Sequence, residues 1–229
     1  MITSLQAIVF DFDGVIANSE PLHMLAFQQV LQSEGVDLEA GDYYTRYLGY
    51  DDKGVFEAVS RDRGRTWTDV HVATLVEQKG ERMQTMLHSG AVLFPGASHF
   101  IREAAATVPI AIASGAQRHE IIEIIESAGL DDLFSVIVAS GDTPESKPSP
   151  APYRLAFERL CAASGTSLDP RRTVAIEDSR WGLESAGGAG LRLVGVTTSY
   201  PAHELPGAEL IADGLNQLTL AALDRLCAH

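Results

Sequence analysis

The chain has 229 residues, of which 45% are hydrophobic and 21% are charged, and its formal net charge is -14 at pH 7. This length and composition are typical of a globular protein with one large α/β domain, or with one domain that carries a smaller insertion. The acidic balance argues against a nucleic-acid-binding face, which needs a basic stripe, and no apolar run approaches the roughly 20 residues of a membrane span.

The N-terminal segment and the cysteines bear on the cellular compartment. No basic segment precedes the first apolar run and Asp11 interrupts that run, so we expect no signal peptide. Cys161 and Cys227 show no metal-binding or redox spacing, which suits a reducing compartment. We therefore expect a cytoplasmic protein that binds neither nucleic acid nor membrane.

The first predicted element is a buried strand over residues 7–10 (AIVF), and Asp11 and Asp13 follow where it ends. Since side chains alternate along an extended chain, the two aspartates point the same way. Like charges side by side at the edge of a core repel each other, unless a cation lies between them or one of them is protonated. The pair therefore predicts a bound cation, with a solvated turn at the strand end as the alternative.

Residues 18–92 contain helical patterns and no convincing strand. Apolar residues recur at helical spacing in four stretches, namely 21–34, 42–48, 53–63 and 68–87. The strand at 7–10 must therefore find its neighbouring strands later in the chain. We predict an inserted all-helical cap domain at 18–92, within a core domain formed by residues 1–17 and 93–229.

After residue 93, short apolar strands alternate with amphipathic helices. The predicted strands cover 108–113, 134–139, 173–176, 191–196 and 210–212, and the predicted helices cover 119–128, 152–162, 183–189 and 216–226. This alternation is typical of an α/β fold, with a Rossmann-like parallel sheet and helices on both of its faces. In such sheets, ligands bind beyond the carboxyl ends of the strands.

Polar side chains that suit a metal and a phosphate group follow the ends of the predicted strands. They are Asp11 and Asp13, Ser114 with Gly115, Lys147 in the loop after the strand at 134–139, and Glu177 with Asp178. Carboxylates without a His or Cys cluster favour a hard cation, and Mg²⁺ fits best because it takes one or two carboxylates, waters and substrate phosphate. Ser114, the Gly115 amide and Lys147 would then bind the phosphate oxygens.

Each of these groups also has a purely structural interpretation. Ser114 could cap the helix predicted at 119–128, and Glu177-Asp178 could cap the following helix together with Ser179; each group could also combine capping with the chemical role. Lys147 could be a solvated loop lysine, which is the usual environment of lysine. The order of the groups along the chain favours the chemical interpretation.

Together these groups resemble the motifs of the haloacid dehalogenase (HAD) superfamily, in its phosphatase and phosphomutase branch. The matching features are DFDG at 11–14, the strand-end Ser114, Lys147 before proline, and Glu177-Asp178, in that order. The helical insertion resembles the cap of the β-phosphoglucomutase-like subfamily, because it begins with the similar run NSEPLH at 18–23. The resemblance covers essentially the whole chain.

The resemblance implies a role for each motif residue. Asp11 would be the nucleophile that forms an aspartyl-phosphate, and Asp13 would protonate the leaving oxygen and then activate water. Asp11, the backbone carbonyl of Asp13 and Asp178 would hold Mg²⁺, with Glu177 bound directly or through water. The second aspartate argues against dehalogenation, because the dehalogenases of the superfamily lack it.

Four cap residues are candidates for contact with the substrate. His23 is either a packed helix residue or a group near the substrate or hinge, and Lys79 either faces solvent or reaches a substrate phosphate, as cap lysines of the mutase do. The mutase pattern places an arginine where this chain has Asp52, and Lys53, Arg46 or Lys79 could substitute for that missing cation.

The function that follows best is a Mg²⁺-dependent phosphatase, acting on a small phosphorylated metabolite such as a sugar phosphate or phosphoglycolate. The alternative is a β-phosphoglucomutase-like sugar phosphomutase, which the loss of a cation at Asp52 weakens. A distant alternative is a non-catalytic interaction protein, although no motif is broken. We expect a small-molecule phosphate ester as the partner, and a monomer or weak homo-oligomer.

Overall fold

The computed structural model describes residues 4–48, 50–87 and 92–228. The chain divides into two compact units, which are a core unit formed by Met1–Asn18 with Ala91–His229 and a cap unit formed by Ser19–Gly90. The boundaries expected from the sequence lie within two residues of these divisions. Among the described residues, no helix combines the length and the apolar character needed to cross a membrane.

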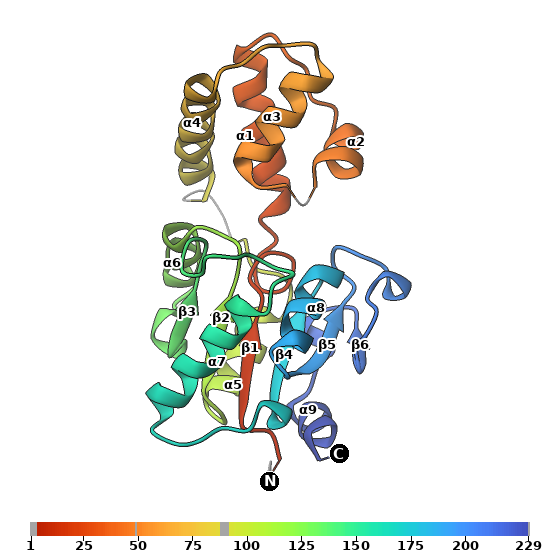
Figure 1. The fold of residues 1–229 in the computed structure, drawn as a ribbon. Coiled ribbons are helices and arrows are strands. Elements are labelled where there is room, and N and C mark those ends of the chain that lie inside the picture. The colour runs from red at the N-terminus through yellow and green to blue at the C-terminus, as the bar shows by residue number, and fades with distance from the viewer. Residues whose placement is uncertain (1–3, 49, 88–91, 229) are drawn as a thin grey trace. The chain divides into compact units, whose positions relative to one another are not determined.

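A six-stranded sheet forms the centre of the core unit. Its order is β3-β2-β1-β4-β5-β6, and every neighbouring pair is parallel. The strands are β1 (Ala7–Phe10), β2 (Ile110–Ala113), β3 (Val136–Val138), β4 (Thr173–Glu177), β5 (Arg192–Val196) and β6 (Leu210–Ala212). Because all the strands run the same way, their carboxyl ends meet at one edge of the sheet (Figure 1). The predicted α/β fold class is confirmed.

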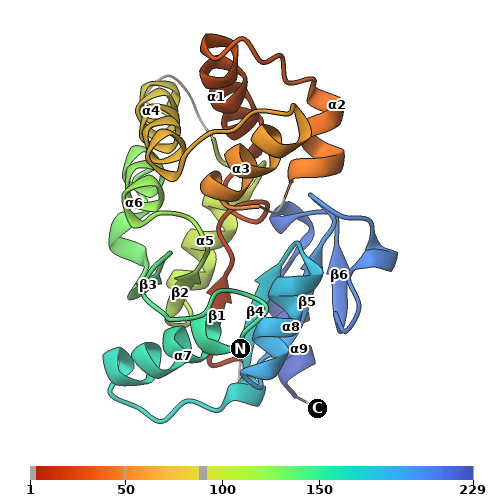
Figure 2. The ribbon, with the colours of Figure 1, turned by 45° about the horizontal axis from the view of Figure 1, so that its top comes forward.

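Helices cover both faces of this sheet (Figures 1 and 2). They are α5 (Ala97–Ala105), α6 (Arg118–Ser127), α7 (Ala151–Ser164), α8 (Arg180–Gly188) and α9 (Leu220–Cys227). On one face, Ala7 and Val9 pack in a single cluster with residues of α7 and α8. On the other face, the Phe10 ring meets Phe100 of α5 edge-on at 6.2 Å. The central strand β1 is therefore buried on both sides, which explains its uninterrupted apolar run.

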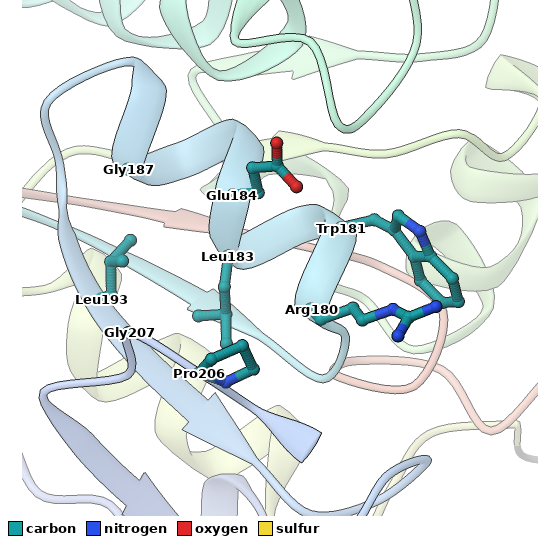
Figure 3. A pocket seen from close by; sticks show the side chains of 8 residues that line it. All are labelled: Arg180, Trp181, Leu183, Glu184, Gly187, Leu193, Pro206 and Gly207. Carbon is teal, nitrogen blue, oxygen red and sulfur yellow. The ribbon is translucent and has the colours of Figure 1, made fainter. Parts of the chain in front are cut away.

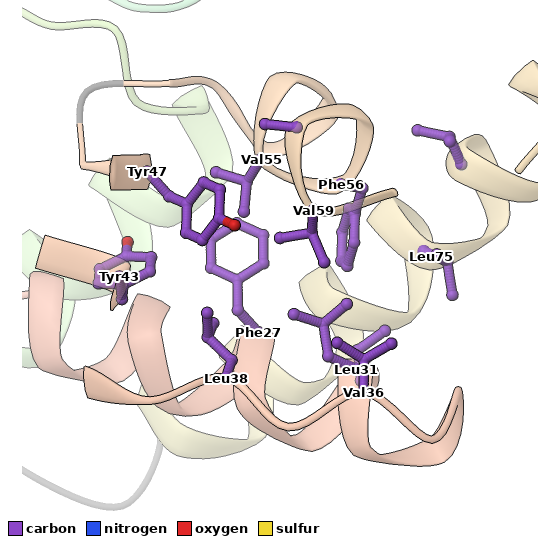
Figure 4. Close-up of a cluster of buried hydrophobic side chains, with 13 residues drawn as sticks. Phe27, Leu31, Val36, Leu38, Tyr43, Tyr47, Val55, Phe56, Val59 and Leu75 are labelled. Carbon is purple, nitrogen blue, oxygen red and sulfur yellow. The ribbon is translucent and has the colours of Figure 1, made fainter. Parts of the chain in front are cut away.

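Helices make up the regular structure of the cap unit in its described residues. They are α1 (Glu20–Ser33), α2 (Ala40–Asp42), a π-helical turn (Tyr43–Tyr47), α3 (Asp52–Asp62) and α4 (Asp69–Leu87). Figure 4 shows the apolar cluster at its centre, where the Phe27 ring lies 5.8 Å from Tyr43 and 5.2 Å from Phe56. The cap unit thus has its own hydrophobic core, which joins α1, α3 and the π-helical turn.

Two parts of the structure differ from the predicted elements. Helix α5 is absent from the prediction, although Phe100, Ile101 and Ala104 are buried at helical spacing. The single helix predicted over 216–226 is wrong, because a 3-10 turn at Leu215–Gln217 precedes α9. The side chain of Thr219 accepts a hydrogen bond from an amide of the first turn of α9, and this N-cap gives the helix its own start.

Candidate active site

The backbone of the sheet holds two of the predicted site residues in place. The Asp11 amide donates to the Ile176 carbonyl at 2.9 Å, and the Ser114 amide donates to the Val138 carbonyl at 2.9 Å. Both hydrogen bonds continue the parallel ladders one residue beyond the ends of β1 and β2. Asp11 and Ser114 are therefore fixed at the carboxyl edge of the sheet, where the topology predicts a ligand site.

Lys147 joins two of the predicted carboxylates, although it comes from a distant loop. Its Nζ atom donates to Asp11 Oδ1 at 2.5 Å and to Glu177 Oε1 at 2.6 Å. The lysine side chain is only 14% exposed, and that of Glu177 is 1% exposed. Charge-assisted hydrogen bonds of this length between buried groups are strong. The interpretation of Lys147 as a solvated loop lysine is therefore wrong.

The Glu177 carboxylate accepts hydrogen bonds on both of its oxygens. Oε1 accepts from Lys147 and also from the Tyr153 hydroxyl, at 2.9 Å. Oε2 accepts from the Asp178 amide at 3.1 Å, and from the amide and hydroxyl of Ser179 at 3.2 and 3.1 Å. A buried carboxyl group is costly to the fold unless hydrogen-bond donors of this kind satisfy its oxygens. Glu177 is consequently held in one orientation by the strand end, the helix start and α7.

Two glycines make room for the acidic side chains. A Cβ atom on Gly182 would lie 1.8 Å from Glu177 Oε1, and one on Gly14 would lie 1.9 Å from Asp178 Oδ2. Gly14 also has a φ of +81°, in the left-handed region that favours glycine. The sequence DFDG therefore ends in glycine because the neighbouring acid occupies the space that a side chain would need.

The electrostatic environment raises the pKa values of the carboxyl groups. Burial raises the pKa of Asp11 well above its usual value, and Lys147 opposes this shift whereas Glu177 reinforces it. Burial, followed by the charge of Glu177, raises the pKa of Asp178 to about 7, and a hydrogen bond from Ser199 acts against this shift. Burial acts to lower the pKa of Lys147, but Asp11 and Glu177 outweigh it and raise that pKa, so the ammonium stays charged.

Three of the four residues predicted to bind metal come together at this edge. One carboxylate oxygen from each of Asp11, Glu177 and Asp178 lies within 4.8 Å of the other two. Among the described residues, Lys147 is the one ammonium that bonds to this group, so the three acids carry an excess of negative charge when they are ionised. An all-oxygen donor set with excess negative charge suits a hard divalent cation such as Mg²⁺.

The other predicted site residues lie beside this carboxylate cluster. Asp13 is partly buried, and its charge contributes to the raised pKa of Asp178, but its carboxylate is not a member of the cluster. Ser114 is buried, and its Oγ accepts a hydrogen bond at 3.0 Å from the amide two residues later. Helix α6 is capped at Gln117, so the N-cap interpretation of Ser114 is wrong. A Cβ atom on Gly115 would meet nothing within 4 Å, so space is open there.

The N-cap of α8 is Ser179 rather than the acidic pair before it. The Ser179 hydroxyl accepts from the Gly182 amide at 3.1 Å, while the same hydroxyl donates to Glu177. The Ser179 part of the capping interpretation is therefore confirmed, whereas the carboxylates of Glu177 and Asp178 are not the N-cap. Ser179 alone starts the helix, and this leaves both acidic side chains at the strand end.

In the cap unit, the candidates His23 and Lys79 are in direct contact. Lys79 Nζ lies 2.7 Å from His23 Nδ1 and 3.0 Å from each carboxylate oxygen of Asp52. Because an ammonium can only donate, His23 Nδ1 accepts, and burial together with the Lys79 charge lowers the pKa of His23 to about 3. Lys79 is fully buried, so its interpretation as part of a solvated helix face is wrong.

The other two cap candidates also have acidic partners inside the cap unit. Arg46 donates to Asp62 Oδ2 at 2.6 Å, and Lys53 Nζ lies 3.3 Å from Glu57 Oε1. Both cations are exposed, at 47% for Arg46 and 60% for Lys53. Exposed ion pairs of this kind are weak and easily exchanged. Arg46 and Lys53 remain candidates for substrate contact, whereas Lys79 is buried in contact with His23 and Asp52.

A surface groove of about 710 Å³ runs along α8 and the segment that leads to β6 (Figure 3). Its lining consists of Arg180, Trp181, Leu183, Glu184, Gly187, Leu193, Pro206 and Gly207. The Arg180 guanidinium stacks over the Trp181 ring at 4.4 Å from its centroid. None of these lining residues belongs to the carboxylate cluster or carries a predicted role, so the groove is not the predicted site.

Two residues that support the acids are absent from the sequence prediction. Tyr153 reaches Glu177 from α7, and Ser199 reaches Asp178 from the loop after β5. The sequence places Tyr153 among apolar residues of a helix, where an aromatic side chain is expected to pack in the core. Its place six residues after Lys147 is the one signal that could have drawn attention to it.

Comparisons with known proteins agree with this arrangement. The family model of haloacid dehalogenase-like hydrolases matches residues 8–196. The protein CbbY of Rhodobacter capsulatus is 33% identical over 203 residues, which are 86% of this chain and 87% of that protein. A phosphorylated carbohydrates phosphatase of Thermotoga maritima is 26% identical over 196 residues, which are 85% of this chain and 87% of that protein.

A solved structure of a related protein is similar to this chain in its three-dimensional fold. CbbY from Rhodobacter sphaeroides, crystallised in complex with xylulose-1,5-bisphosphate, has a TM-score of 0.83 and 30% sequence identity. The match covers 96% of this chain and 99% of that chain. The family match includes the strand ends that carry Asp11, Ser114 and Asp178, and the loop that carries Lys147. The chain therefore belongs to the family of haloacid dehalogenase-like hydrolases.

Proposed function

We propose that this protein is a Mg²⁺-dependent phosphatase that hydrolyses a small phosphorylated sugar or similar metabolite, with Asp11 as the nucleophile. The observation that carries the proposal is the buried cluster of Asp11, Glu177 and Asp178 around Lys147. Two relatives add support, because one is named a phosphorylated carbohydrates phosphatase and another was crystallised with a sugar bisphosphate. The oxygen donors fit Mg²⁺, which Asp11, Asp178 and the Asp13 carbonyl would hold, with Glu177 bound directly or through water.

In the first half of the reaction, an Asp11 oxygen attacks the phosphorus atom of the ester. An aspartyl-phosphate forms, the bond from phosphorus to the ester oxygen breaks, and Asp13 gives its proton to the leaving oxygen. In the second half, the Asp13 carboxylate takes a proton from water, which attacks phosphorus and releases orthophosphate and free Asp11. Asp13 must therefore hold a proton in one half-reaction and lack it in the other.

The neighbouring residues support these steps by position and charge. Lys147 holds Asp11 Oδ1 and acts against the burial that raises the pKa of Asp11, and the second Asp11 oxygen would attack phosphorus. The ammonium of Lys147, the hydroxyl of Ser114 and the open amide side of Gly115 would bind the phosphate oxygens. The chemistry that bound Mg²⁺ supplies is neutralisation of the negative charge on those oxygens.

A phosphomutase would use the same nucleophile, but it must also hold a second phosphate group. The cap cation expected for that role is replaced by Asp52, and the buried Lys79 is paired with that same carboxylate. This pairing favours hydrolysis over transfer to a second position of the sugar.

The first experiment is an assay of orthophosphate release, with and without Mg²⁺. The panel contains phosphorylated hexoses and pentoses, a pentose bisphosphate and 2-phosphoglycolate, and the products from β-glucose 1-phosphate are identified in parallel. Mg²⁺-dependent release from members of the panel is the expected result. Conversion of β-glucose 1-phosphate to glucose 6-phosphate with little release of orthophosphate would establish the mutase instead. Wild-type protein without either activity would overturn the proposal.

A further inference from the structure

Tyr153 is a buried side chain that the mechanism above does not use. It lies on the first turn of α7, is 0% exposed, and belongs to the cluster that covers one face of the sheet. Its hydroxyl donates to Glu177 Oε1 at 2.9 Å, and Lys147 Nζ lies over its ring, 4.9 Å from the ring centroid. One aromatic side chain therefore contacts both members of the Lys147–Glu177 ion pair.

We propose that Tyr153 is a positioning residue for phosphoryl transfer, which holds the Lys147 ammonium where it can serve Asp11 and the transferred phosphate. The inference rests on the proposed phosphatase function and names a further residue of the same site. Tyr153 acts through Lys147 and Glu177, and it does not touch the reacting atoms.

The geometry gives Tyr153 two separate contributions. Its hydroxyl and the Lys147 ammonium share the same oxygen, Glu177 Oε1, so the hydroxyl fixes the position of the acceptor that Lys147 uses. Its ring lies against the ammonium on another side, and a cation–π contact at this distance is favourable for a desolvated cation. Together, the hydroxyl and the ring of Tyr153 restrict the movement of Lys147 Nζ. The N–H group of the ammonium that bonds to neither Asp11 nor Glu177 is thereby held in a direction set by the protein.

The hydroxyl of Tyr153 is well suited to a permanent donor role. A tyrosine hydroxyl carries a proton to donate, and the 2.9 Å hydrogen bond directs that proton to Glu177 Oε1. Phenylalanine in its place would keep the ring against Lys147 but leave Glu177 Oε1 with Lys147 as its one side-chain donor. The two contributions can thus be separated by substitution.

The test compares Tyr153→Phe and Tyr153→Leu with the wild-type protein. Three quantities are measured with Mg²⁺ present: kcat and KM for p-nitrophenyl phosphate, the dissociation constant of inorganic phosphate by calorimetry, and the melting temperature. We expect Tyr153→Phe to lower kcat/KM about tenfold and to weaken phosphate binding several-fold, since it removes one hydrogen bond to a charged group. Tyr153→Leu, which also removes the ring, should lower kcat/KM and the affinity for phosphate further.

Tyr47→Phe is the matched control, because the buried Tyr47 also donates to a carboxylate, Asp62 Oδ2, at 3.0 Å in the cap unit. It loses the same type of bond without touching Lys147. We expect its phosphate affinity to equal that of the wild type even if its melting temperature falls. A purely structural role for Tyr153 would give the same pattern, with a lower melting temperature and unchanged kcat/KM and phosphate affinity.

The outcomes separate this inference from the proposed function. An active wild type with Tyr153→Phe kinetics and phosphate affinity at the wild-type level would overturn the positioning role and leave the phosphatase intact. A wild type that binds phosphate but releases none from any ester would overturn the function, while weaker phosphate binding by Tyr153→Phe would still support the positioning role. If Tyr153→Leu does not fold, Tyr153→Phe decides the matter alone.

Discussion

The core unit and the cap unit each bury a charged lysine, but they balance its charge differently. In the core unit, Lys147 meets two carboxylates directly and a third, Asp178, belongs to the same cluster. In the cap unit, Lys79 meets the single carboxylate of Asp52 and a neutral histidine. The first cluster has an excess of negative charge when its acids are ionised, whereas in the second the direct contacts pair one ammonium with one carboxylate.

This difference indicates which buried polar cluster carries chemistry. A buried charge is costly unless it is paired, so a balanced pair satisfies the fold and needs nothing from outside. In the core cluster, burial and then the neighbouring negative charges raise the pKa values of Asp11 and Asp178, and such a cluster becomes more stable when a cation binds. The core cluster is therefore the one that we expect to respond to metal.

Removal of the proposed nucleophile should have the largest effect on phosphate release. Asp11→Asn keeps the size of the side chain and removes the carboxylate that attacks phosphorus, so we expect phosphate release to fall by more than about 10³-fold. The melting temperature in the absence of metal should not fall, because one of three repelling acids has been neutralised. Turnover at the wild-type rate would contradict the nucleophile assignment.

Gly182→Ala should disturb the core cluster by crowding alone. The new Cβ atom would lie 1.8 Å from the Glu177 carboxylate, so Glu177 or α8 must shift and the bond to Lys147 must change. We expect a loss of activity of at least about tenfold and a lower free energy of unfolding, by about 1–3 kcal/mol.

Gly187→Ala is the control for this substitution, because both glycines lie on α8. Its Cβ atom would come no closer than 3.4 Å to Leu193, a position that a small shift of that side chain accommodates. Activity should stay at the wild-type level. Equal losses in the two variants, measured by phosphate release and urea unfolding, would show that crowding of Glu177 is not the cause.

Asp52→Asn should turn the balanced cap cluster into an unbalanced one. Lys79 would keep His23 Nδ1 and the Phe27 ring but lose its counter-charge, and an unpaired buried ammonium is destabilising. Since the Asp52 side chain is 31% exposed, we discount the loss to about 2 kcal/mol in the free energy of unfolding. Urea denaturation measures it.

Glu57→Gln is the control for the cap cluster. It breaks the exposed ion pair with Lys53, and we expect a change within about 0.5 kcal/mol. A loss for Asp52→Asn no larger than for Glu57→Gln would contradict the view that the buried pair is a structural unit.

The smallest expected effect is the dependence of protein stability on pH. Because the pKa of Asp178 is raised to about 7, its contribution to the stability of the metal-free protein is complete below about pH 4 and is lost as the pH rises through about 7. The lowered pKa of His23 has the opposite effect. The contribution of His23 to stability is complete above about pH 6.5 and is lost as the pH falls below that value. The absolute melting temperature therefore mixes the two effects.

The shift in melting temperature caused by Mg²⁺ separates them, because His23 contributes equally with and without metal. Mg²⁺ must displace the proton of Asp178, and Asp11 is a second proposed ligand with a raised pKa, so the apparent affinity should rise at least about tenfold per pH unit below about pH 7. Thermal melts with Mg²⁺ or EDTA between pH 5 and pH 8 measure this. A Mg²⁺-induced shift that does not change with pH would contradict the raised pKa.

The sequence by itself determined the fold class, the order of the motifs and most of the site. Apolar runs that end in acids are local features, and parallel pairing must bring such ends to one edge, so Asp11, Lys147 and Asp178 could be placed without coordinates. Helix starts were harder to predict, because a single cap such as Thr219 can divide an apolar pattern that looks continuous.

The tertiary structure alone decided how the charges are shared. No local pattern says that Lys147 bonds to both Asp11 and Glu177, or that Lys79 is buried against Asp52, because these partners lie far apart in the chain. The roles of Tyr153 and Gly182 could not be predicted for the same reason. A tyrosine or a glycine on a helix carries no signal of the carboxylate that it faces in the folded protein. Hydrophobic periodicity is set by each element alone, whereas the pairing of buried charges depends on which elements pack together.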